Sequence, residues 1–155
     1  MSFPRNSTMK MVMNREMSRL LERMNIRASE LDQLRAFESI QTIDAGGCTV
    51  FPEEFERNTH VKVEDFQDRT GYECFINHLH RLYSSDRQSL IENLAFAVGL
   101  SNALGSMDGL KSFQTILSVG DGDCTVRFNE CRYGENWISE DLESYREEAI
   151  LLLRT

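Results

Sequence analysis

The chain has 155 residues, 41% of them hydrophobic, which is typical of one domain that buries its own core without disulfides or metals. No run of about 18 apolar residues is present, which excludes a membrane-spanning helix. The first residues lack the apolar stretch of a secretory signal, so we expect a cytoplasmic protein.

The net charge of −8 is unevenly distributed. Residues 1–37 carry seven basic and four acidic side chains, which gives +3, whereas residues 38–155 carry ten and twenty-one, which gives −11. The acidic part should repel nucleic acid and attract basic partners. The plainer interpretation is that acidity keeps a small protein soluble.

The pattern along residues 9–38 predicts helix. Its apolar residues recur at helical spacing, at Met13, Met17, Leu20, Met24, Leu31 and Leu34. Residues 25–27 could divide the segment into two helices, because Ser29 followed by Asp32 three residues later can begin a second one.

A β-hairpin is predicted next, from two β-branched runs joined by a Gly-containing turn. The runs are residues 39–43 and 48–51, and the turn is 44–47. Pro52 should end the second strand. Residues 60–63 could form a further short strand.

Two helices are predicted after this hairpin. Residues 68–83 have the apolar spacing of an amphipathic helix, and Ser84 or Ser85 should cap a second one. Residues 94–100 are apolar nearly all round, which indicates the buried helix of the fold.

A second hairpin is predicted over residues 112–128, with its turn at 120–123. A final helix should begin at Ser139, because Ser139 can cap it and Glu140 and Asp141 favour the positive end of its dipole.

Hairpins alternating with blocks of helices predict a single α+β domain rather than a doubly wound fold. We expect an antiparallel sheet from two hairpins, packed with about four to five helices. The domain would comprise an N-terminal helical segment, residues 1–38, and an α+β body, residues 39–155.

Motifs for catalysis, cofactors and metals are not evident. The sequence has no Gly-rich phosphate loop and no Gly-x-Ser-x-Gly, and its four cysteines lack the paired spacing of a zinc site. His78 and His80 would point about 200° apart on the predicted helix and could not share a metal. We therefore predict no catalytic residue, metal or cofactor, with a small enzyme whose site forms only in three dimensions as an alternative.

The N-terminal arginines suggest a second alternative. Arg15, Arg19, Arg23 and Arg27 recur every four residues and would form a basic stripe on one helix. Residues 20–31 also resemble a helix-turn-helix, so residues 15–35 could serve a nucleic-acid-binding regulator. The charge of −11 on the rest of the chain opposes this, and the plainer interpretation is a basic face lying on the acidic body or in solvent.

Aromatic residues accompany acidic ones after each hairpin, in residues 51–56 and 133–137. Aromatic anchors supply packing energy at an interface, and carboxylates steer a basic partner toward them. The alternative is that the rings belong to the core and the acids are only solvated. The predicted partner-binding residues are Glu53, Glu54, Glu56, Asp121, Asp123, Glu135, Trp137, Glu140, Glu143 and Glu147.

The last third of the chain carries a resemblance to a known group. The stretch runs from Ser112 through Cys124-Thr125-Val126-Arg127-Phe128 to Trp137-Ile138-Ser139-Glu140-Asp141-Leu142. It resembles bacterial toxin-immunity proteins of the contact-dependent growth inhibition type. The resemblance implies a protein that neutralises a basic toxin, often a nuclease, by forming a tight complex with it, and it assigns no role to individual residues.

Overall fold

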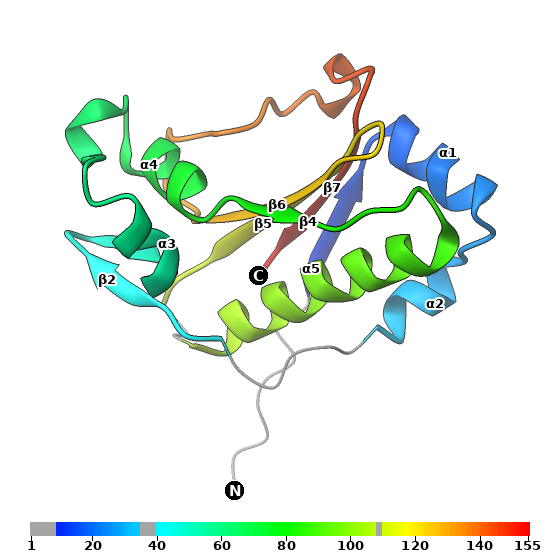
Figure 1. Cartoon of the computed structure of the whole chain (residues 1–155), viewed down its shortest axis with the longest axis horizontal. Helices are drawn as coiled ribbons and strands as arrows, with labels where there is room; N and C mark the ends of the chain where they lie inside the picture. The colour runs from blue at the N-terminus through cyan, green and yellow to red at the C-terminus, as the bar shows by residue number, and fades with distance from the viewer. Residues whose placement is uncertain (1–8, 35–39, 108–109) are drawn as a thin grey trace, which may run out of the picture.

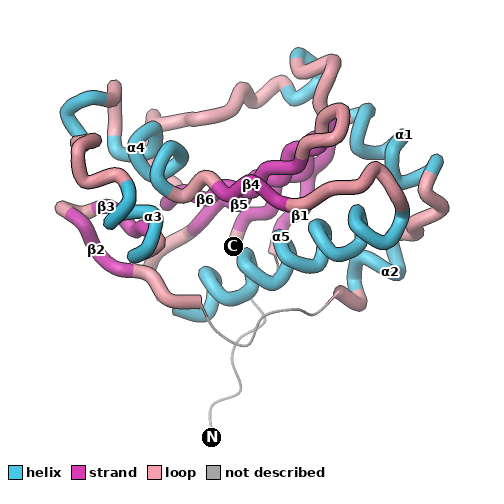
Figure 2. Tube along the Cα trace, viewed as in Figure 1, coloured by secondary structure: helices cyan, strands magenta, loops and turns pink. Residues whose placement is uncertain are grey.

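The computed structural model describes residues 9–34, 40–107 and 110–155. In these residues the chain forms a five-stranded antiparallel sheet in the order β1-β7-β5-β6-β4, a separate two-stranded sheet and five α-helices (Figure 1, Figure 2). The predicted α+β class with an antiparallel sheet is therefore confirmed.

The elements have the following bounds. The main sheet consists of β1 (Lys10–Met13), β4 (Leu79–Arg81), β5 (Phe113–Val119), β6 (Cys124–Glu130) and β7 (Ala149–Arg154). The small sheet consists of β2 (Ile43–Ala45) and β3 (Cys48–Val50). The helices are α1 (Arg15–Arg23), α2 (Ala28–Asp32), α3 (Pro52–Arg57), α4 (Arg69–Ile76) and α5 (Arg87–Met107), with 3-10 helices η1 (Val63–Asp65) and η2 (Leu142–Ser144).

The predicted second hairpin forms the centre of the main sheet. β5 and β6 pair from Phe113 opposite Glu130 to Val119 opposite Cys124, and β7 pairs with the other side of β5. Because side chains alternate along a strand, β5 places Phe113 and Val119 in the core beneath α5 and Ile116 in a smaller core on the opposite face.

Helix α5 covers one face of the sheet together with α1 and α2 (Figure 1). Its residues Leu94 and Ala97 are 0% exposed, which confirms the predicted buried helix. The cap is Asp86 rather than Ser84 or Ser85, because the Asp86 carboxylate accepts the Ser89 amide at 2.8 Å.

The first hairpin lies in a small lobe with α3 and α4, outside the main sheet (Figure 1). Its turn has two residues instead of four, because Gly46 and Gly47 both adopt the positive φ that such a tight turn requires. Pro52 ends the strand as expected and begins α3. The strand predicted at 60–63 is wrong, because Val61 and Val63 pack into the core of this lobe without pairing.

Residues 10–13 form strand β1, not the start of a helix. They pair with β7, from Lys10 opposite Arg154 to Met13 opposite Leu151. Methionine is compatible with both a helix and a strand. Side chains alternate between the two faces of a strand, and this alternation places Met11 and Met13 against the core. The predicted division into two helices is confirmed, with Asn25 at a φ of 54° between α1 and α2.

Residues 68–83 do not form one helix either. Helix α4 ends at Ile76, and the buried Asn77 amide donates to the carbonyls of Thr49 and Phe128. The chain then extends into β4, so the reasoning from helical geometry about His78 and His80 was wrong. Two residues apart on extended chain they lie on one side, with ring centres 4.6 Å apart.

The helix predicted from Ser139 is also absent from the structure. Residues 131–148, called the arch below, cross the sheet on the side opposite α5 with only the single turn η2 (Figure 1). The following apolar run 149–153 becomes β7, because it fills the place between β1 and β5 and is buried on both faces.

Candidate functional site

The structure divides the predicted binding residues into two groups. Five of them lie on the arch and two in the neighbouring β5–β6 turn: Glu135, Trp137, Glu140, Glu143 and Glu147, with Asp121 and Asp123. Glu53, Glu54 and Glu56 lie on α3 in the small lobe, well separated from the β5–β6 turn (Figure 1). The ten residues therefore do not form one face, and the arch is the larger candidate surface.

Trp137 is the exposed aromatic residue that the binding hypothesis requires. Its exposed fraction is 43%, and Tyr133 beside it is fully exposed. Phe51 and Phe55 instead pack against the cores of the molecule. The alternative that these rings are core residues thus holds for α3 and fails for the arch.

Some of the arch carboxylates have structural partners. Glu143 accepts the Arg15 amide at 2.7 Å, and Glu135 accepts the Thr70 amide at 3.2 Å. Glu140 and Glu147 make no hydrogen bond or ion pair with any residue in the described ranges. These two carboxylates are therefore free to meet a partner.

A buried ion pair anchors the start of the arch. Arg132 binds both oxygens of Glu73, at 2.6 and 3.1 Å, and also Glu130 at 3.1 Å. Glu73 is 0% exposed and further accepts the amides of Thr49 and Glu130. This bidentate geometry ties the arch to α4, β3 and β6.

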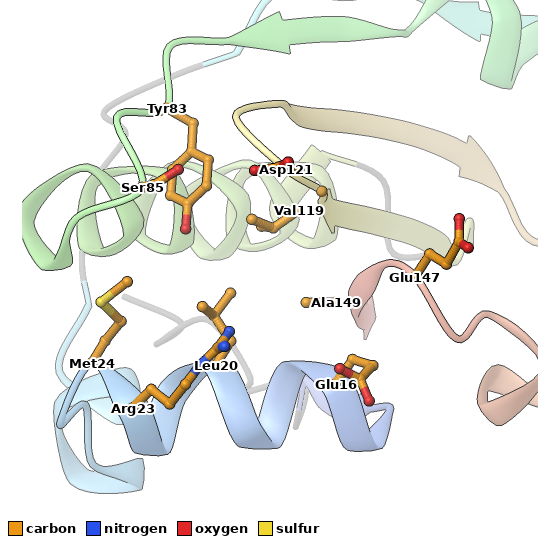
Figure 3. Close-up of a pocket in the computed structure, with 11 residues that line it drawn as sticks. Glu16, Leu20, Arg23, Met24, Tyr83, Ser85, Val119, Asp121, Glu147 and Ala149 are labelled. Carbon is orange, nitrogen blue, oxygen red and sulfur yellow. The ribbon is translucent and has the colours of Figure 1, made fainter.

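A hollow of about 520 Å³, called the end hollow below, opens between α1, the loop before α5 and the β5–β6 turn (Figure 3). Its apolar floor consists of Leu20, Met24, Val119 and Ala149. Its charged rim consists of Glu16, Arg23, Asp121 and Glu147, and Tyr83 lies on one side. Asp121 and Glu147 are predicted binding residues, whereas Glu16 and Tyr83 were missed because they come from distant segments.

A second hollow of about 270 Å³, called the arch hollow below, lies between the sheet and the arch. The Arg127 guanidinium lies 5.1 Å from the Trp137 ring centre and 3.2 Å from Nε2 of His78. Burial, then the charges of Arg127 and His80, lowers the pKa of His78 to about 4, so His78 is neutral at pH 7. His80 lies 3.6 Å from an Asp123 oxygen.

Sequence reasoning missed the arch hollow because it placed both histidines on a helix. The alternation of His78, Leu79 and His80 could have indicated a strand, but three residues are too few to separate the two periods.

The three buried cysteines do not supply a nucleophile with a lowered pKa. Cys48, Cys74 and Cys124 are buried, whereas Cys131 is exposed and thus not a core residue. Burial raises the pKa of Cys48 to about 11 and that of Cys124 to about 12, and it raises the pKa of Cys74 further. Across the described residues no group of three His, Cys, Asp or Glu side chains could hold a metal ion, and no helix is long and apolar enough to cross a bilayer.

The N-terminal arginines do not form one stripe. Arg15, Arg19 and Arg23 lie on α1, whereas Arg27 follows the turn; Arg19 pairs with Glu16 at 2.9 Å. Helix α2, in the position of a recognition helix, has only five residues. A helix of this length presents too few side chains to read bases in a DNA major groove.

Fold and surface together define an α+β protein with an acidic arch that exposes Trp137 and Tyr133. The chain belongs to the Uncharacterized protein PM0498 family, which it matches over residues 12–155. No curated protein and no solved structure matches it significantly.

Proposed function

We propose that this protein binds a basic protein domain through its arch, and that it acts as an immunity protein against a basic toxin. The observation that carries the proposal is the exposed Trp137, which lines a hollow of about 400 Å³ together with Glu135 and Glu140. An exposed indole can bury a large area at the centre of an interface, and the surrounding carboxylates raise the rate of association.

The charge of the arch supports the same proposal. Residues 131–148 contain six Asp or Glu and two Arg, a net charge of −4. Arg132 is bound to the buried Glu73, so Arg146 is left to offset the acids at the surface. A surface of this kind favours a basic partner over nucleic acid.

The test titrates a purified basic toxin domain against the full chain, and the genes that flank this one are the first place to look for such a domain. Trp137→Ala should weaken the complex by about tenfold or more, mainly through faster dissociation. The double variant Glu140→Lys, Glu147→Lys should slow association at low salt. The control is Glu53→Lys, Glu56→Lys on α3, which makes the same change of charge away from the arch.

Equal slowing by the arch and α3 variants would show that general charge, and not the arch, governs the encounter. An acidic partner would contradict the argument from charge. Immunity itself requires that the chain protects cells expressing the toxin domain, and that Trp137→Ala protects them less well.

A further inference from the structure

Arg127 is a partly buried cation without a carboxylate partner. It extends from β6 toward the arch, where it contacts His78 and the face of Trp137. It forms no ion pair with any residue of the ranges 9–34, 40–107 and 110–155. Arg132, also partly buried, by contrast binds two carboxylates, Glu73 and Glu130.

The contacts that Arg127 does make leave its charge uncompensated. Neutral His78 accepts one hydrogen bond from the Arg127 guanidinium, and Glu148 attracts the guanidinium only from longer range. Arg127 is partly buried, so water solvates its guanidinium incompletely, and this burial lowers the pKa of Arg127. A partly desolvated cation normally has a counter-ion, so a negative group from outside the chain would stabilise this one.

The arch hollow provides further groups that suit an anion. Its lining includes the hydroxyls of Ser118 and Thr125 and the imidazole of His80, which can donate hydrogen bonds beside the guanidinium. Two acids also line it: Asp123 lies next to His80, and Glu148 has an exposed side chain. Trp137 and Tyr145 add aromatic surface on the side of the arch.

We propose that the arch hollow binds a small organic anion, whose phosphate or carboxylate pairs with Arg127 while a flat apolar part packs on Trp137. Arginine forms directional, charge-assisted hydrogen bonds with both oxyanions. The volume of about 270 Å³ restricts the ligand to a small molecule. The site shares Trp137 with the proposed protein interface, but binding of a small anion is measured without any protein partner, so either proposal can fail without the other.

Trp137 is the only tryptophan of the chain, so its indole N–H gives one NMR signal located at the site. The probes are inorganic phosphate, adenosine monophosphate and benzoate, each titrated at low ionic strength. We expect saturable shifts of the Trp137 and His80 signals with at least one of them. Tighter binding of adenosine monophosphate than of benzoate would identify a phosphate ligand, and the reverse order a carboxylate.

Arg127→Gln should weaken binding of the best probe by about tenfold or more. The matched control, Arg146→Gln, removes the same charge from the exposed part of the arch and should bind normally. Unshifted signals with all three probes, or equal binding by Arg127→Gln, would overturn the proposal. If Arg127→Gln does not fold, Thr125→Val and Ser118→Ala replace it; unchanged affinity in both would likewise overturn the proposal.

Discussion

At the scale of single residues, Glu73 is a buried charge that needs hydrogen-bond and ion-pair partners inside the fold. It is fully buried, and two amides and the Arg132 guanidinium satisfy its oxygens. We expect Arg132→Met to lower the free energy of unfolding by about 3–5 kcal/mol, because it leaves a buried carboxylate unpaired. Urea denaturation measures this, with the exposed Arg146→Met as a control near zero. A loss below about 1 kcal/mol would show that water or another cation replaces Arg132.

His78 predicts a pH dependence of stability. Burial lowers its pKa from 6.5 to about 4 in the folded protein, so the unfolded chain binds more protons between these values. The contribution of neutral His78 is complete above about pH 7 and disappears as the pH falls toward about 4.

Thermal melts from pH 7 to pH 4 test this expectation. His78→Asn removes the titrating group, so the stability of the variant should fall less steeply over this range than that of the native protein. Parallel curves for the two proteins would mean that His78 titrates normally and that carboxylates cause the whole loss.

At the scale of elements, α5 supplies much of the main core. Leu94 is 0% exposed within it, so Leu94→Ala should cost about 2–5 kcal/mol through lost burial and a residual cavity. Asn102→Ala is the control, because Asn102 is exposed on the same helix. Chemical denaturation compares the two variants, and equal small losses would place α5 at the periphery of the folding unit.

At the scale of the whole molecule, the net charge of −8 opposes binding to nucleic acid. We expect no measurable affinity for duplex DNA at about 0.15 M salt, as measured by fluorescence anisotropy. The arginines of α1 are too few to offset the acidic surface. A submicromolar complex whose affinity decreases steeply with salt would contradict this and support the regulator alternative.

The fold class, the second hairpin and the buried helix could be predicted from local patterns in the sequence. Residues 113–119 and 124–130 are two seven-residue runs on either side of a Gly-Asp turn, and α5 has 21 residues with a continuous apolar stretch. Such signals are long enough to distinguish a period of 2 from one of 3.6. The exposed acids of residues 131–148 were likewise evident, because charge requires no partner to be recognised.

Tertiary pairing alone decided the three other strands of the main sheet and the site beside them. Residues 10–13, 79–81 and 149–154 are short segments whose side chains suit a helix or a strand. Pairing with the edges of β5, β6 and β7 selects the extended form. Arg127 meets His78 across 49 residues of sequence, and Arg132 meets Glu73 across 59. No local pattern encodes such contacts, because they arise only when strand register brings distant side chains to one face.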